Sequence, residues 1–268
     1  MKSPALRTYA IAYLVFLYAP IILLPLFAFN DSRIIAFPLS GFTTAWFVEM
    51  WNDPQLWRAL RNSLIVAVSS AILATSFGVF AARASTRFVF PFKAGIMGLI
   101  MLPLVLPEMI VAMSLLVVLL AIGIPLSLFT IILGHVLLCT PFAVAILASA
   151  FQSLDQSLEE AAYDLGETPL STFRLIILPL VMPGIISSLL ISFTISLDEF
   201  IIAFFLGGNQ TTLSVYIFGQ FRFPAKVPAV MALGTVLVLL SIVLLAIAET
   251  FRRRGIAKVG GKDTGGFL

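Results

Sequence analysis

Six long runs of hydrophobic residues, separated by short polar stretches, dominate the chain. They cover residues 9–29, 64–82, 94–121, 128–150, 175–206 and 228–248. Each run approaches or exceeds the roughly 20 apolar residues that an α-helix needs to cross the hydrocarbon core of a bilayer. The pattern therefore predicts an all-α membrane protein with six transmembrane helices, in which residues 1–268 form a single transmembrane domain.

The composition excludes a soluble or disordered chain. Of the 268 residues, 60% are hydrophobic and only 11% are charged, with a mean hydropathy of +1.10. A soluble domain carries roughly 25% charged residues, so this chain has too few charges to coat a surface that faces water. Its 24 Phe residues and long aliphatic runs are equally unlike a disordered polymer. The lipid bilayer is the expected surrounding, and the small net charge of +3 gives no indication of a nucleic-acid partner.

The basic residues predict the orientation. With a cytoplasmic N-terminus, eleven of the 16 Lys and Arg residues lie on the cytoplasmic side and five lie outside. The positive-inside rule then predicts a multi-pass protein with both termini in the cytoplasm. The cytoplasmic residues are Lys2, Arg7, Arg83, Arg87, Lys93, Arg174, Arg252, Arg253, Arg254, Lys258 and Lys262. The outside residues are Arg33, Arg58, Arg61, Arg222 and Lys226.

The cytoplasmic loop 151–174 has the character of a docking helix. Its apolar residues recur at the spacings of three and four that are typical of a helix, at Leu154, Leu158, Ala161, Ala162 and Leu165. Gly166 is predicted to end this helix, and Thr168 followed by Pro169 breaks the chain before the next span. Helices that lie on a membrane surface usually carry Lys and Arg on the polar face, whereas this one carries carboxylates. We therefore expect it to bind another protein.

A seven-position pattern in this region resembles the EAA loop of ABC-importer permeases. It consists of Glu160, Ala161, Ala162, Gly166, Ile176, Leu178 and Pro179. The six-helix plan extends the resemblance over nearly the whole chain, and in detail the chain is similar to the second permease subunit of spermidine/putrescine-type importers. Supporting stretches are residues 62–64, 106–108, 183–184 and 196–199.

The resemblance implies a type I ABC-importer permease in the bacterial inner membrane. It implies that loop 151–174 couples the chain to an ATPase, and that Gly166 permits the sharp turn that seats the helix. The implied partners are a second, non-identical permease subunit, a dimer of ATP-binding-cassette ATPases and a periplasmic solute-binding protein. The implied coupling residues are Glu160, Ala161, Ala162, Asp164, Gly166, Ile176, Leu178 and Pro179.

No catalytic constellation is present in the sequence. A phosphate-binding loop needs Gly, four residues, Gly, Lys and Ser or Thr between a strand and a helix, and residues 255–263 are only a near miss in a Gly-rich tail. No HExxH or CxxC pattern occurs, and the single Cys139 cannot form an intrachain disulfide. We expect no enzyme activity, metal or cofactor in this chain, and we expect ATP and Mg²⁺ on the ATPase.

Three acidic residues fall within the predicted spans: Glu108, Asp198 and Glu199. A carboxylate at the centre of a membrane costs about 2.5–3.5 kcal/mol on insertion scales, so such residues are candidates for a solute path. Small residues recur every four positions before the last two acids, at Gly184, Ser188, Ser192 and Ser196. On a helical wheel Glu199 falls at about 60°, inside this stripe, and Asp198 at about 320°, beyond its edge. Interfacial, solvated carboxylates remain the alternative for this pair.

Two further polar side chains have competing interpretations. Trp46 belongs either to an interfacial aromatic belt or to a cation–π face at the mouth of the path. His135 is expected to be a buried histidine with a satisfied hydrogen bond, and a gating role is the alternative.

The solute class follows from the charges. The cores of the six spans lack Lys and Arg, which an anionic solute would need, while the acids suit a cation. We therefore predict a small cationic or zwitterionic solute, such as a polyamine, that moves into the cytoplasm. A neutral or opine-like amino-acid derivative is the alternative solute. An ion-coupled secondary transporter is the alternative mechanism, although it leaves the docking loop unexplained.

Overall fold

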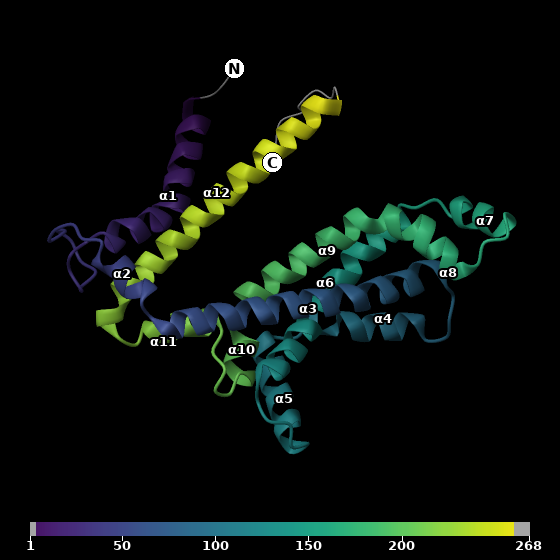
Figure 1. Ribbon diagram of the computed structural model, residues 1–268, viewed down its shortest axis with the longest axis horizontal. Coiled ribbons are helices and arrows are strands. Elements are labelled where there is room, and N and C mark those ends of the chain that lie inside the picture. Colours follow the sequence, from purple (N-terminus) through teal and green to yellow (C-terminus); the bar gives the residue numbers. More distant parts are fainter. Residues whose placement is uncertain (1–3, 260–268) are drawn as a thin grey trace. The chain divides into compact units, whose positions relative to one another are not determined.

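The computed structural model describes residues 4–259 (Figure 1). Lys2 and Lys262, two of the basic residues used to predict the orientation, lie outside the described residues. The described chain is helical apart from its loops and one isolated bridge between Asn30 and Phe42. It divides into two compact units, one formed by the described residues 4–53 and 217–259 and the other by residues 54–216.

Three long helices pack along one another to form the body of the second unit (Figure 1): α3 (Pro54–Arg87), α6 (Leu128–Gln152) and α9 (Leu178–Asp198). Glycines stand where their backbones approach most closely. A Cβ atom added at Gly78 of α3 would lie 2.9 Å from the Cβ of Ala143 on α6. One added at Gly184 of α9 would lie 2.6 Å from the Cβ of Ala150 on α6. Small residues thus allow the close packing by which membrane helices associate.

The small-residue stripe predicted on α9 faces the other two long helices. The hydroxyls of Ser188 and Thr75 are hydrogen-bonded at 3.0 Å, which ties α9 to α3. The thiol of Cys139 on α6 donates to the carbonyl oxygen of Ser192 at 3.5 Å. The stripe is therefore occupied by helix packing within this unit.

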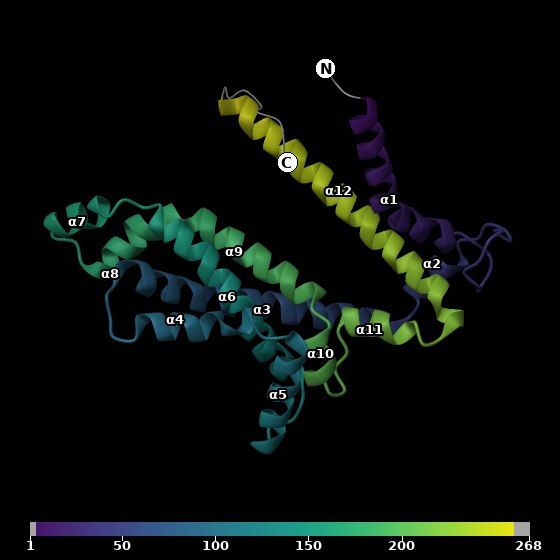
Figure 2. The ribbon, with the colours of Figure 1, turned by 180° about the vertical axis from the view of Figure 1, so that it is seen from behind.

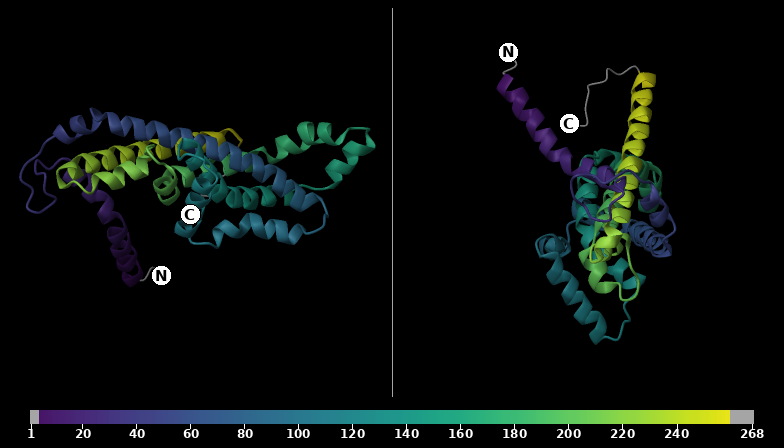
Figure 3. Two further views of the ribbon diagram at one scale, coloured as in Figure 1. Left: turned by 90° about the horizontal axis from the view of Figure 1, so that it is seen from below. Right: turned by 90° about the vertical axis from the view of Figure 1, so that its left-hand side faces the viewer.

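The third hydrophobic run, predicted as one span over 94–121, is two helices with a sharp bend. α4 (Lys93–Met101) and the 3₁₀ turn η1 (Leu102–Leu104) meet α5 (Glu108–Ala121) at 104°. The right-hand view of Figure 3 shows α5 turning away from the end of α4. Pro103 and Pro107 stand at the bend, where proline removes backbone donors and stops a helix from continuing.

The fifth run, predicted as one span over 175–206, is also divided. It begins with a π-helical turn, η2 (Phe173–Ile177), continues as α9, and ends in the short helix α10 (Ile201–Leu206). The backbone leaves the helical region at Glu199, whose ψ is 125°. α10 packs against α5 and α6. The apolar core around it contains Val66, Val111, Ala112, Leu119, Ile131, Leu138, Ile202, Ala203 and Leu206.

The first unit is built on two antiparallel helices, α1 (Pro4–Ala28) and α12 (Val227–Val259), which Figure 2 shows from behind. Gly234, near the start of α12, faces Leu24, near the end of α1. The short helix α2 (Ala45–Trp51) and the 3₁₀ turn η3 (Pro224–Lys226) complete this unit. α11 (Leu213–Gln220) begins in the second unit and ends in the first.

Five helical segments in the described part of the chain are long and apolar enough to cross a membrane, and the bent pair α4–α5 makes a sixth. Many of their large apolar side chains point outward, as they do in spans that face lipid. The predicted all-α architecture is confirmed. The helices extend beyond several predicted spans: the segment predicted over 64–82, for instance, is the 34-residue α3.

Candidate functional site

The loop between α6 and α9 contains a helix where the sequence predicts one, α7 (Ser157–Asp164), followed by the single turn α8 (Pro169–Thr172). The Asp155 carboxylate accepts a hydrogen bond from the backbone N–H of Ser157 at 3.0 Å and so holds the first turn. This bond, with a further one from the Ser157 hydroxyl, lowers the pKa of the Asp155 carboxyl. At the other end, the Thr168 hydroxyl oxygen accepts from the N–H of Ser171 and caps α8.

Gly166 ends α7 as predicted, in a left-handed conformation with φ of +87°. Its N–H donates to the carbonyl oxygen of Tyr163 at 2.9 Å, and the N–H of Glu167 donates to that of Ala162 at 3.0 Å. This pair of bonds is a Schellman motif, which reverses the chain and satisfies the last carbonyls of the helix. Glycine adopts the required conformation without the strain that a Cβ atom would bring.

The motif residues divide between the surface and the interior. Glu160, Ala161 and Asp164 are exposed on α7, whereas Ala162 is buried against the bundle. The apolar side chain of Leu165, at the end of the helix, is 86% exposed.

The later motif positions lie where the chain enters the membrane-spanning helix. Ile176 belongs to η2, and Leu178 and Pro179 begin α9. Ile176 and Leu178 are half-buried and Pro179 is exposed. These three residues therefore shape the return of the chain into the bundle and are not on α7.

Two arginines at the end of α3 contact this loop through a hydrogen bond and ion pairs. In the sequence, these residues indicated only the orientation of the chain in the membrane. Arg87 Nη2 donates to the carbonyl oxygen of Leu154 at 2.9 Å, and Arg87 Nε lies 2.9 Å from Glu159 Oε1. Arg83 Nη2 lies 3.9 Å from Glu159 Oε2. The spacing of Arg83 and Arg87, one helical turn apart at the end closest to an acidic loop, is the signal that could have identified them.

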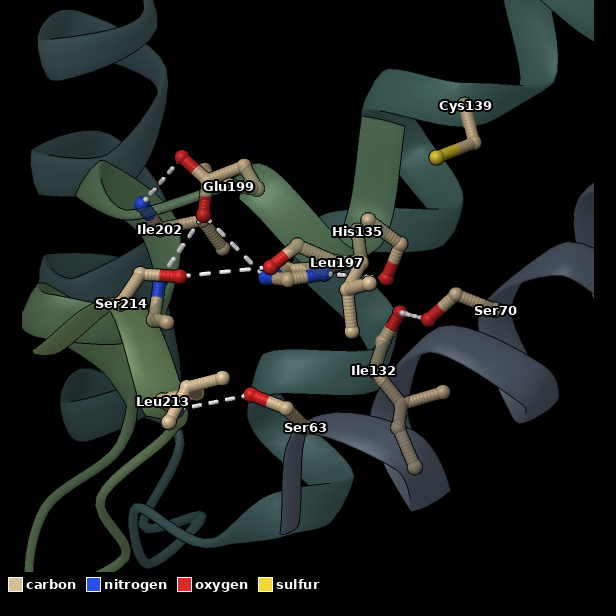
Figure 4. A network of polar contacts seen from close by, with 12 residues as sticks. Ser63, Ser70, Ile132, His135, Cys139, Leu197, Glu199, Ile202, Leu213 and Ser214 are labelled. Atoms are coloured by element: carbon tan, nitrogen blue, oxygen red, sulfur yellow. Dashed lines mark hydrogen bonds and ion pairs between the residues drawn. The ribbon is translucent and has the colours of Figure 1, made fainter. Parts of the chain in front are cut away.

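Glu199 forms the centre of a buried polar network (Figure 4). Its Oε1 accepts from the N–H of Ile202 at 2.9 Å and its Oε2 from the N–H of Ala203 at 3.2 Å, so it caps the start of α10. His135 Nε2 lies 3.2 Å from the same Oε2, and His135 Nδ1 shares a hydrogen bond of 2.7 Å with the Ser196 hydroxyl. The Glu199 side chain is only 5% exposed, and both of its oxygens have partners.

The helical wheel predicted that Glu199 faces the same side as the small-residue stripe, and the structure buries it beside His135, which also bonds Ser196 of that stripe. The wheel assumes a continuous helix through residue 199, whereas α9 ends at Asp198 and the chain turns there. Burial of Glu199 results from this turn, which directs the carboxylate at the N-terminus of α10. His135 is buried and hydrogen-bonded, which was the first of the two interpretations of this residue.

The other candidate path residues do not join this network. Asp198 is exposed at the end of α9, and Glu108 is exposed in the first turn of α5. Trp46 belongs to the first unit, where its buried ring donates through Nε1 to the carbonyl oxygen of Asn30 at 2.7 Å. The Arg33 guanidinium lies 5.7 Å from the Trp46 ring centroid and covers a face of the ring.

A polar cavity of about 470 Å³ lies in the second unit beside the N-terminal end of α3. Its lining includes Arg58, Asn62, Gln210 and Thr211, and none of the four predicted path residues. Among residues 4–259 no three His, Cys, Asp or Glu side chains come together as they would around a metal ion.

Comparison with protein families gives a match over residues 74–255 to the family described as "Binding-protein-dependent transport system inner membrane component". The putrescine transport system permease protein PotI of Escherichia coli K12 is 39% identical over 230 residues, covering 83% of this chain and 81% of that protein. The spermidine/putrescine transport system permease protein PotC of the same strain is 34% identical over 239 residues, covering 89% and 90%.

Solved structures share the fold at lower identity. A chain of a bacterial ABC transporter that imports the acidic polysaccharide alginate superposes with a TM-score of 0.72 at 16% identity, covering 92% of this chain and 98% of that one. A chain of the MetNI methionine ABC transporter gives 0.58 at 18% identity, covering 78% and 98%. The ABC-importer permease fold predicted from the EAA-type motif is confirmed.

Proposed function

The chain belongs to the family of binding-protein-dependent transport system inner membrane components, and we propose that it is the permease subunit that couples an ATPase to solute import through α7. The observation that carries this proposal is the shape of loop 151–174. A Schellman turn at Gly166 presents a short helix whose carboxylates, Glu160 and Asp164, and terminal Leu165 are exposed at one end of the bundle. An exposed, capped helix of this kind fits a groove on a partner.

The proposed complex contains three further kinds of subunit. One α7 helix docks one ATPase, and ATP-binding cassettes work in pairs, so a second permease subunit supplies the second docking helix. ATP and Mg²⁺ are bound by the ATPase dimer. A solved relative with a TM-score of 0.65 is an alginate transporter in complex with its "alginate pentasaccharide-bound periplasmic protein". A periplasmic binding protein is accordingly the proposed source of solute here.

Both termini are proposed to lie in the cytoplasm, as the distribution of Lys and Arg predicts. Within the first unit, α1 and α12 are antiparallel, so residues 4 and 259 are at the same end of that pair. Within the second unit, Arg83 and Arg87 contact the loop that contains α7, so the basic end of α3 and the docking helix share one side. Both observations agree with the distribution of Lys and Arg.

The proposed solute is a polyamine or a similar small organic cation. The relatives named for putrescine and for spermidine/putrescine transport support this class. Asp198 and Glu108, which are exposed at the ends of their helices, are the acids proposed to meet the cation. Glu199 is proposed to support the wall of the path without contacting the solute, because its carboxylate is hydrogen-bonded to α10. Trp46 is proposed to lie at the outer mouth of the path, and the Arg33 guanidinium covers one face of its ring.

The test is solute uptake into proteoliposomes that contain the complete transporter and its binding protein. We expect labelled putrescine to accumulate only when ATP is present on the ATPase side, and we expect the ATPase to co-purify with this chain. Uptake driven by an ion gradient without ATP would contradict the importer assignment. ATP-dependent uptake of a neutral amino-acid derivative, with no uptake of putrescine, would keep the importer and replace the solute.

A further inference from the structure

Polar contacts attach α7 to the rest of its unit more than apolar packing does. Of its eight residues only Ala162 is buried, so apolar packing contributes little to holding this helix in place. The end of α3 contacts this loop through one hydrogen bond, from Arg87, and through ion pairs of Arg87 and Arg83 with Glu159. We propose that Arg87 and Arg83, through Glu159, lock α7 to α3, so that a movement imposed on α7 moves α3 with it.

We call the cluster of Arg83, Arg87 and Glu159 the lock. Its contacts are distributed along the loop. Arg87 contacts the chain before α7 at the Leu154 carbonyl and the first turn of α7 at Glu159, each at 2.9 Å. Arg83 reaches the same Glu159 carboxylate, and its guanidinium lies 4.4 Å from the ring centroid of Phe173, after α8. Two side chains from one helix therefore contact the loop before, within and after the docking helix.

Burial makes these contacts more effective than ordinary surface ion pairs. The Arg87 side chain is 9% exposed and the Glu159 side chain 14%. Exposed pairs are weak because water and salt screen them, whereas removal of one member of a largely buried pair leaves a charge without its partner. Arg87 is further fixed by its hydrogen bond to the backbone, which no rotation of the Glu159 side chain can replace.

The two consecutive glutamates on α7 have different surroundings. Glu159 turns toward α3 and is paired with arginine, whereas Glu160 is exposed. Adjacent residues on a helix point about 100° apart, so one carboxylate can hold the bundle while the next faces a partner. Glu159 is thus a positioning residue for coupling, and Glu160 belongs to the docking surface. This inference rests on the proposed function of α7.

The experiment compares Glu159→Gln with the matched control Glu160→Gln. The first measurement is hydrogen exchange of the backbone of α7 in the purified chain, which requires no partner. We expect faster exchange in Glu159→Gln and in Arg87→Gln, and wild-type exchange in Glu160→Gln. Wild-type exchange in Glu159→Gln would overturn the lock.

The second measurement is the amount of putrescine imported per ATP hydrolysed by the reconstituted transporter. We expect Glu159→Gln to retain the ATPase on co-purification but to lower this ratio below that of the wild type, because ATP is then hydrolysed without a matching movement of α3. The charge swap Arg87→Glu with Glu159→Arg should recover part of it. A wild-type ratio in Glu159→Gln, or loss of the ATPase to the same extent as in Glu160→Gln, would overturn the proposal. Failure of the wild-type chain to bind any ATPase would instead refute the proposed function and leave the exchange result as the test of the lock.

Discussion

Gly166 provides the sharpest test of the docking loop, because its environment separates backbone strain from steric fit. A Cβ atom added there would meet nothing within 4 Å inside the protein. The residue nevertheless has φ of +87°, and the two hydrogen bonds that end α7 depend on this conformation. Any effect of a substitution on the isolated chain should therefore reflect the backbone conformation.

The expected magnitudes follow from the conformational preferences of each side chain. Gly166→Ala should destabilise the turn by about 1–2 kcal/mol, the cost of a left-handed conformation for an ordinary L-residue. A change of one or two kcal/mol alters a two-state population about 5- to 30-fold. Gly166→Val should cost more, because a β-branched side chain tolerates positive φ least. Gly166→Asn should be nearly neutral, since Asn occupies this position in helix C-caps.

The assay is ATP-dependent uptake by the reconstituted transporter, with membrane insertion of each variant checked by its amount in the detergent extract. We expect uptake to decrease in the order Gly, Asn, Ala, Val while insertion stays constant. Wild-type uptake in Gly166→Val would refute the role of the turn in coupling. Equal loss in Gly166→Asn and Gly166→Val would show that the size of the side chain at the docked surface matters, and not the backbone conformation.

Three further predictions concern packing, the polar network and pH. Gly184→Ala should destabilise the chain by about 1–3 kcal/mol, because the added methyl group overpacks α9 against α6. Gly98→Ala is the control and should not destabilise the chain, since a Cβ atom at Gly98 on α4 would have no neighbour within 4 Å. Thermal unfolding in detergent measures both. Glu199→Gln should lower the free energy of unfolding by about 1.5 kcal/mol or more, because it removes charge-assisted hydrogen bonds to α10. Asp198→Asn should lower uptake without changing the melting temperature. A stable but inactive Glu199→Gln would assign Glu199 to the solute path and not to the structure. Because the pKa of Asp155 is lowered in the folded chain, its stabilisation of α7 is present above the usual pKa of 3.8 and is lost as the pH falls through the lowered value. The protection factors for backbone hydrogen exchange at the start of α7, which compare the observed rate with the intrinsic rate at each pH, should therefore fall in acid, and Asp155→Asn should remove that pH dependence.

Local patterns were sufficient to predict the helices and the end of the docking helix. A run of about 20 apolar residues leaves an α-helix as the main way to satisfy the backbone in lipid, so the existence of the spans follows from hydropathy. The turn at Gly166 follows from a glycine after a periodic segment. The third run reads as one span in the hydropathy pattern, and its bend of 104° at Pro103 and Pro107 is seen only in the structure, where α5 packs against α10.

The sequence by itself determined the helical architecture, the family and the position of helix α7, because each depends on short-range spacing and composition. Only the tertiary structure decided which polar groups meet across the bundle. Arg87 and Leu154 are 67 residues apart, and no periodicity connects them. Glu199 and His135, whose side chains lie 3.2 Å apart, are also distant in sequence, and they meet because the chain leaves the helix after Asp198 instead of continuing to residue 206. Partners of this kind are set by the packing of helices that are distant in sequence, and a buried charge takes whichever donor that packing brings within hydrogen-bonding distance.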